Sequence, residues 1–268
     1  MGNAYSLLAD LHTHTISSGH AYSTLQENLV VAAAQGLKML AVTDHGPAVD
    51  GAPNKYYFMN EDIWPQQQEG IWLLRGVEAN ILPGGVLDLP DSVLEKLDFV
   101  LAGFHYDGYA PHGDAKQYTE DLLRVMENPF VHAISHPGNP AYPIDNEAFV
   151  HQAVEKDILI EINNSSLGSE MRPGSWENCR KIVSLGKAVG AKFIISSDAH
   201  YCSLIGKTDA ACRLAAEVGI SEERIVNSHP MKVATFLQQK GKRLSPELFV
   251  EDCDEPYRPS TDSALSVL

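Results

Sequence analysis

Two histidines near the start of the chain, His12 and His14, are separated by one residue and follow the apolar segment 5–9. In a β-strand, side chains two positions apart point to the same face, so both imidazoles would lie side by side at the end of such a strand. Two imidazoles in this position can bind one metal ion. The pair alone is weak evidence, because histidines also occur as hydrogen-bonded core or surface residues.

The same arrangement, an apolar segment followed by a histidine or a carboxylate, recurs along the chain. The candidate ligands found in this way are His12, His14, His20, His45, Glu78, His105, His136, Asp198 and His200. A catalytic metal ion binds about four protein ligands or fewer, so this set fits two or three ions. Imidazole and carboxylate ligands without thiolate favour zinc, manganese or iron. The set therefore predicts a catalytic metal site.

Apolar segments that alternate with helical patterns predict the elements that position these residues. We expect strands at 5–9, 37–43, 71–77, 99–104, 130–135, 158–162 and 192–197. We expect helices at 25–35, 61–69, 91–97, 114–127, 145–156, 175–189, 204–218 and 231–240. Strands that alternate with helices favour right-handed βαβ units and a parallel sheet. The sequence predicts an α/β fold.

Two α/β architectures agree with this order of elements. A closed barrel gathers the carboxyl ends of its strands around one axis, and candidate ligands follow six of the seven expected strands. We therefore favour a distorted seven-stranded (βα) TIM-like barrel over an open doubly wound sheet. We expect one catalytic domain, 1–243, and a peripheral tail, 244–268, that is rich in Pro, Ser, Asp and Glu.

Composition restricts the partners of the protein. The formal net charge is −15, from 35 acidic and 20 basic residues, which disfavours binding of long nucleic acid. The acidic surface would repel a phosphate ester, but bound metal ions can attract one locally. No apolar segment approaches the length of a membrane span, no export signal stands at the start, and four cysteines lack C-x-x-C spacing. We expect a cytoplasmic protein without membrane binding; homo-oligomerisation is left open.

Six short motifs carry the candidate ligands in a fixed order. They are Asp10-Leu11-His12-Thr13-His14-Thr15, Thr43-Asp44-His45-Gly46, Gly76-Val77-Glu78-Ala79-Asn80, Gly103-Phe104-His105, Ser135-His136-Pro137-Gly138-Asn139 and Ser197-Asp198-Ala199-His200. Together they resemble the PHP (polymerase and histidinol phosphatase) superfamily, and most of all its stand-alone YcdX-type phosphatases. The resemblance extends from about residue 7 to about residue 237. It implies a PHP barrel with a trinuclear metal centre, usually of zinc, and phosphoester hydrolysis.

The resemblance also implies how the ligands divide among three divalent ions. The first ion would be bound by His12, His14, Glu78 and Asp198, the second by His20, His45 and His200, and the third by Glu78, His105 and His136. A carboxylate can bridge two ions because it has two oxygens, whereas a neutral imidazole offers one lone pair. We expect a metal-activated hydroxide to attack a small phosphate monoester, with Glu78 and Asp198 as catalytic residues.

Four other residues each have two interpretations. His112 is either the acid that protonates the leaving group or a loop histidine. Asp10 either orients a ligand imidazole or is a buried, hydrogen-bonded strand residue. Asn139 and Asn163 either contact substrate or stabilise turns. We interpret His132, which lies four residues before His136, as a core residue.

Three other functions remain as alternatives to a small-molecule phosphatase. Amidohydrolases also combine His-x-His, later histidines and an Asp in a (βα) barrel, but His20, His45 and His200 exceed that pattern. A nucleotide or short-oligonucleotide phosphoesterase would use the same chemistry. A non-catalytic module would be expected to have lost ligands, and none is missing. Specificity is expected to depend on loops 48–58 and 106–113.

Overall fold

The computed structural model describes residues 5–168, 172–244 and 249. Its central sheet contains parallel strands in the order β1-β2-β4-β6-β7-β8-β9. Their bounds are β1 (Ala9–Thr13), β2 (Met39–Val42), β4 (Ile71–Leu82), β6 (Phe99–Gly103), β7 (Ala133–Ile134), β8 (Leu159–Asn163) and β9 (Phe193–Ser196). Two short strands, β3 (Gln67–Gln68) and β5 (Val86–Leu87), pair with β4 in the antiparallel direction.

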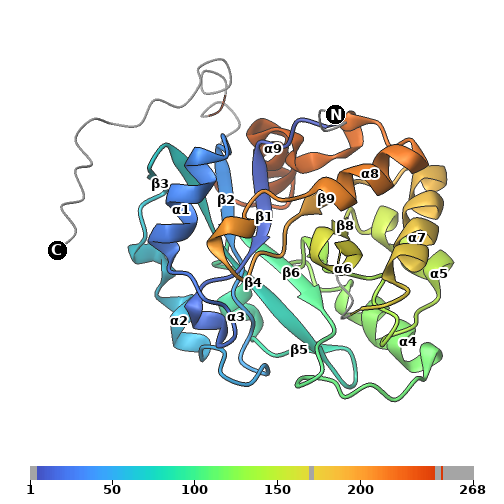
Figure 1. Cartoon of the computed structure of the whole chain (residues 1–268). Coiled ribbons are helices and arrows are strands. Elements are labelled where there is room, and N and C mark those ends of the chain that lie inside the picture. The colour runs from blue at the N-terminus through green and yellow to red at the C-terminus, as the bar shows by residue number, and fades with distance from the viewer. Residues whose placement is uncertain (1–4, 169–171, 245–248, 250–268) are drawn as a thin grey trace.

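The first and last strands lie side by side and nearly close the sheet (Figure 1). The backbone N–H of Asp198 donates to the carbonyl of His12 at 3.0 Å. Asn227 completes the contact, because its Nδ2 donates to the carbonyl oxygens of Ala9 at 2.8 Å and Ile195 at 2.6 Å. The fold is therefore the expected seven-stranded TIM-like barrel, and the alternative of an open sheet is wrong.

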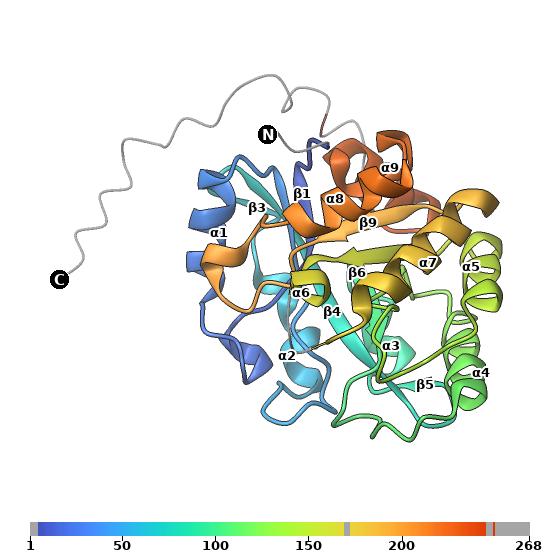
Figure 2. The same cartoon turned by 45° about the vertical axis from the view of Figure 1, so that its right-hand side comes forward.

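Helices surround the strands. They are α1 (Leu25–Ala34), α2 (Lys55–Met59), α3 (Asp91–Leu94), α4 (Ala115–Val125), α5 (Asn146–Glu155), α6 (Asn164–Gly168), α7 (Ser175–Val189), α8 (Asp209–Val218) and α9 (Pro230–Gln239). Short 3₁₀ turns include η1 (Ile16–Ser18), η2 (Glu61–Ile63) and η3 (Cys202–Leu204). In Figure 2, α4, α5 and α7 lie along one side of the barrel and α1 and α2 along the other. This arrangement leaves the strand ends free to carry a site.

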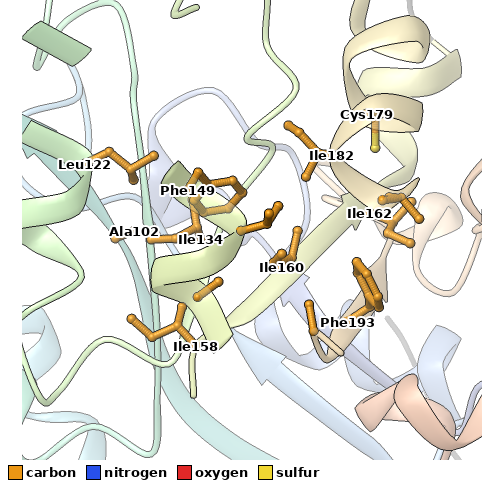
Figure 3. Packing of buried hydrophobic residues seen from close by; sticks show 14 of the residues in the cluster. Ala102, Leu122, Ile134, Phe149, Ile158, Ile160, Ile162, Cys179, Ile182 and Phe193 are labelled. Atoms are coloured by element: carbon orange, nitrogen blue, oxygen red, sulfur yellow. The ribbon is translucent and has the colours of Figure 1, made fainter. Parts of the chain in front are cut away.

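The largest hydrophobic cluster lies between the strands and the helices. Figure 3 shows Phe149 of α5 packed beside Ile134 and Ile160. Burial of one such side chain stabilises the fold by about 1.5–3 kcal/mol. A second cluster joins Leu11 and Phe99 to residues of α9. Packing on both faces of the strands fixes the positions of their carboxyl ends.

Two strand boundaries differ from expectation, and both differences affect the site. The first strand covers Ala9–Thr13 instead of 5–9, so His12 lies within it and His14 follows it directly. The strand expected at 71–77 continues to Leu82, because residues beyond Val77 keep pairing with β6. Glu78 therefore lies inside a strand, and not at its end.

The helix expected at 61–69 is wrong. Only η2 and the short strand β3 form there, since Pro65 lacks a backbone N–H and restricts the residue before it. A helix forms earlier instead, at α2, inside the expected loop 48–58. The side chain of Asn54 accepts the N–H of Tyr56 at 3.0 Å and so caps the first turn.

The remaining differences concern the lengths of two elements and the tail of the chain. The expected strand 130–135 contracts to β7, and the helix expected at 204–218 begins only at Asp209. Most of the expected tail, 245–248 and 250–268, lies outside the described residues. Phe249 is described, and its buried ring lies 4.9 Å from the ring of Trp72. No described helix is both long enough and apolar enough to cross a membrane.

Candidate metal centre

The nine predicted ligands gather at the carboxyl ends of the strands, and the first group of them is compact. Nε2 of His12 lies 3.1 Å from Nε2 of His14 and 3.2 Å from Oε2 of Glu78. Nε2 of His14 lies 3.2 Å from Oδ1 of Asp198. Four residues from three distant parts of the sequence thus direct their donor atoms toward one point.

A second group lies toward the mouth of the site. Nε2 of His20 and Nε2 of His200 are 3.1 Å apart, and the ring centroids of His20 and His45 are 4.9 Å apart. Donor atoms of His14, His45 and His200 all lie within 4.8 Å of one another. His14 therefore stands between the first group and the second.

Glu78 joins the groups. Its Oε1 lies 2.7 Å from Nε2 of His136 and 3.2 Å from Nε2 of His105. Its Oε2 faces His12 and lies 2.9 Å from Nδ1 of His45. The two oxygens of one carboxylate thus face different histidines, as a bridging ligand requires.

Electrostatics favour a cation at this point. Burial alone would raise the pKa of Glu78, but the surrounding histidines, led by His105 and His12, hold it well below its usual range. Burial would lower the pKa of His12, but nearby carboxylates, led by Glu78 and Glu161, raise it well above its usual value. Without a metal ion, a proton on His12 would balance these carboxylates. The site therefore carries an excess of negative charge that a cation can neutralise.

Burial also keeps part of the ligand set neutral. Burial and the neighbouring imidazoles of His200 and His45 lower the pKa of His14 well below its usual value. The pKa of His20 is lowered for the same reasons. A neutral imidazole offers a lone pair to a metal ion, whereas a protonated one does not.

Unpaired polar atoms show that these residues fit metal ions. Among the described residues, the buried atoms Nδ1 of His45, Oε2 of Glu78 and Nε2 of His105 make no hydrogen bond, although the first two lie 2.9 Å apart. Leaving such an atom without a partner costs about 1–3 kcal/mol. The three residues form one group in which each offers a ligand atom within 4.8 Å of those of the others. A divalent ion between them would provide the missing partner, and the histidine and carboxylate donors suit zinc, manganese or iron.

Comparison with known proteins agrees with this geometry. The PHP domain family model matches residues 10–165. The chain belongs to the PHP family. It is 45% identical over 236 residues to a probable phosphatase of Clostridium botulinum strain Hall, covering 88% of this chain and 96% of that protein. It is 43% identical over 243 residues to a probable phosphatase of Aliivibrio fischeri, covering 90% and 98%.

Solved structures share the PHP fold. The histidinol phosphate phosphatase of Lactococcus lactis, solved with zinc, L-histidinol and phosphate, aligns with a TM-score of 0.60 at 17% identity, covering 80% of this chain and 94% of that one. A histidinol phosphatase of Listeria monocytogenes described as putative aligns at 0.56 and 17%, covering 74% and 97%. At this identity the likeness concerns the fold.

Two residues of the predicted ligand set of this PHP protein have an unusual backbone conformation. His136 and Asp198 have positive φ angles of 31° and 55°. Such backbone costs about 1–3 kcal/mol for residues other than glycine and is common at functional sites. The N–H of His136 donates to Oε2 of Glu161 at 2.5 Å, and that of Asp198 donates to His12. These hydrogen bonds hold the strained segments in place.

A cavity of about 180 Å³ opens beside the centre. Besides predicted ligands, its walls include Val49, Tyr106, Asp107 and Arg172. Nη1 of Arg172 lies 3.9 Å from Oδ2 of Asp198. Arg172 was not predicted from the sequence, because it follows no expected strand directly. Tyr106 and Asp107 belong to one of the loops expected to set specificity.

The carboxylate that contacts Nδ1 of His12, the ring nitrogen facing away from the centre, is Glu161, and not Asp10. Oε1 of Glu161 lies 2.6 Å from Nδ1 of His12. Asp10 instead accepts the backbone N–H groups of Ser197 at 3.2 Å and Gly206 at 3.0 Å, which agrees with its second interpretation. A charged residue within the apolar strand β8 was the available signal for Glu161.

The surroundings of His112, Asn139 and Asn163 differ from one another. His112 is exposed, its ring stacks on that of Tyr118 at 4.4 Å, and it does not line the cavity, so the structure gives no support to its role as an acid. Asn139 accepts the N–H of Ala141 at 3.1 Å, as a turn residue does. Asn163 is buried, and its Nδ2 donates at 3.1 Å to both Glu161 and Asp198. It supports the ligands rather than facing substrate.

Proposed function

We propose that this PHP protein is a metal-dependent phosphatase that removes phosphate from a small phosphorylated molecule. The proposal rests on one observation: the two carboxylate oxygens of the buried Glu78 face different histidines. Bound divalent ions, zinc first and manganese or iron as alternatives, would stabilise a phosphoryl oxygen and lower the pKa of a water molecule toward neutrality. Phosphate monoester hydrolysis needs both effects.

The three groups of donor atoms support a division among three ions. We assign His12, His14, Glu78 and Asp198 to the first ion, His20, His45 and His200 to the second, and Glu78, His105 and His136 to the third. The carboxylates of Glu78 and Asp198 would bind the ions and offset part of their positive charge. Both side chains are almost fully buried.

Arg172 supports a phosphorylated substrate. Its guanidinium lines the cavity near Asp198 and is the one cationic side chain among the described lining residues. A guanidinium matches phosphate because it donates two parallel hydrogen bonds. We infer that Arg172 binds the phosphoryl group, while the rest of the substrate extends toward Tyr106 and Asp107.

The size and charge of the protein favour a small substrate. The cavity of about 180 Å³ is smaller than the pockets of about 300–1,000 Å³ that hold drug-sized ligands. The net charge of −15 opposes a long polyanion at the surrounding surface. A mononucleotide remains an outcome of the test below.

The test compares Glu78→Gln with Glu127→Gln in metal-loaded protein. Glu127 pairs with Lys156 at 2.7 Å on the surface, so its variant is a matched control. We expect Glu78→Gln to reduce hydrolysis of p-nitrophenyl phosphate about 100- to 1,000-fold, the scale of lost transition-state charge stabilisation. Retained hydrolysis in Glu78→Gln would refute the proposal. Amide, lactone and mononucleotide substrates on the same wild-type sample would identify an alternative hydrolase.

A further inference from the structure

Three ligand imidazoles are held from behind, on the ring nitrogen that faces away from the centre. Nδ1 of His12 contacts Glu161 at 2.6 Å, and Nδ1 of His14 contacts Oγ of Ser18 at 3.0 Å. Nδ1 of His105 contacts Oδ1 of Asn80 at 2.7 Å. In each ring, Nε2 is left to face the other ligands.

Each of these contacts leads to a carboxylate outside the ligand set. Glu161 contacts its histidine directly. Oγ of Ser18 donates to Oδ1 of Asp44 at 2.6 Å, and Nδ2 of Asn80 donates to Oδ2 of Asp88 at 2.5 Å. Glu161 and Asp44 are buried, and Asp88 is half-buried.

The direction of these hydrogen bonds fixes the ring tautomers. Because the Ser18 hydroxyl donates to Asp44, its oxygen must accept from His14. Because the Asn80 amide nitrogen donates to Asp88, its oxygen must accept from His105. Each Nδ1 therefore carries the proton and each Nε2 presents a lone pair, the state needed to bind a metal ion.

The group at the mouth is held differently. Within the described part of the chain, Nδ1 of His20 makes no hydrogen bond, and its side chain is exposed. Nδ1 of His200 contacts the backbone oxygen of Asp198 at 3.1 Å and Oδ1 of the same residue at 3.4 Å. That carboxylate already faces His14. Among the residues that the structure describes, no carboxylate outside the predicted ligand set contacts either ring.

We propose that the carboxylates of Glu161, Asp44 and Asp88 make metal affinity unequal across the centre, a difference called the grading below. The position formed by His20, His45 and His200 then has the weakest affinity and is the one that exchanges its metal ion with solution. The inference rests on the proposed metal centre. Outer partners of this kind typically change metal affinity about 10- to 100-fold, because they fix the ring and raise its basicity. The position at the mouth lacks them and is the most open to solvent. Enzyme activity then depends on the concentration of free metal ion, because that concentration sets the occupancy of this position.

The experiment measures release of zinc from the loaded full chain into excess 4-(2-pyridylazo)resorcinol, with total metal counted by mass spectrometry. We expect one equivalent to leave at least about 10-fold faster than the rest. His20→Ala should lack this fast equivalent. Release of all equivalents at one rate, or a fast equivalent that persists in His20→Ala, would overturn the inference.

Glu161→Gln tests the grading itself. It keeps the shape of the side chain but removes the charge behind His12, so a slow equivalent should leave about 10- to 100-fold faster. Glu127→Gln should retain wild-type rates. If Glu161→Gln fails to fold by circular dichroism, Ser18→Ala removes the equivalent contact behind His14 and should accelerate release in the same way. Wild-type rates in a folded Glu161→Gln or Ser18→Ala protein would contradict the inference.

The same data separate this inference from the proposed function. Wild-type protein that holds fewer than two ions when loaded would refute the metal centre and both proposals with it. Protein that holds its ions and hydrolyses p-nitrophenyl phosphate, but releases all ions at one rate, would refute the grading alone.

Discussion

Two fully buried histidines, His12 at the carboxyl ends of the strands and His132 just before β7, have opposite surroundings. His12 faces Glu78 and Glu161, and these carboxylates raise its pKa well above the usual value despite burial. His132 accepts the N–H of Val100 at 2.9 Å, and its ring stacks on Phe99. Burial, followed by nearby lysines, lowers its pKa well below the usual value.

The comparison shows that burial of a histidine does not reveal its role, whereas its neighbours do. Carboxylates around His12 create a place for a cation. Aromatic rings and lysines around His132 exclude one. One short segment makes the same point, because His132 and His136 are four residues apart, yet only His136 reaches Glu78.

The largest effect should come from the histidine at the centre. We expect His12→Ala to lose metal and to reduce hydrolysis of a phosphate monoester about 100- to 1,000-fold, because a ligand of the first ion is gone. Metal content and turnover measured on one sample check this. His132→Asn, which keeps an acceptor for the N–H of Val100, is the matched control and should retain its metal. Equal metal loss in both variants would contradict the difference in role between His12 and His132.

Arg172 should have the next largest effect. We expect Arg172→Ala to raise KM for a phosphate monoester about 10- to 100-fold while metal content is unchanged, because a charged hydrogen bond to phosphate contributes roughly 1.5–3 kcal/mol. Separate determination of kcat and KM provides the test. Arg180→Ala on α7 is the control for loss of a surface cation. An unchanged KM for Arg172→Ala would remove this residue from substrate binding.

The smallest effect concerns pH and stability. The pKa of His132 is lowered in the folded state, while the unfolded chain takes up its proton near pH 6.5. The contribution of His132 to the free energy of unfolding is therefore fully present above about pH 6.5. It falls as pH decreases below this value, by at most about 1.4 kcal/mol per pH unit. Urea unfolding at several pH values should show a shallower decrease in His132→Asn than in wild type. His151→Asn, at an exposed position of α5, should keep the wild-type slope; an unchanged slope in His132→Asn would contradict this account.

Sequence alone predicted the barrel and the clustering of the nine candidate ligands because both follow local rules. Apolar segments mark the strands, and a histidine or carboxylate directly after a segment marks the catalytic end. The structure brings all nine candidates together on this basis. Their assignment to individual ions stays a prediction.

The parts that sequence did not predict depend on contacts between distant residues. Glu161 meets His12 across 149 positions of sequence, and strand periodicity marks it only as a charged residue in an apolar segment. His112 was interpreted as a possible acid because of its loop, but its ring packs on Tyr118. The side chain of Asn54 helps to start a helix in a segment that composition suggested was a loop.

We propose that ions bound around Glu78 enable phosphate monoester hydrolysis. The direct measurement is a titration of metal-free wild-type protein with zinc, in which bound metal and turnover of p-nitrophenyl phosphate are recorded together. We predict that metal-free protein is inactive, that turnover rises with occupancy, and that His132→Asn behaves as wild type. Turnover in the metal-free protein, or full metal occupancy without turnover, would contradict the account.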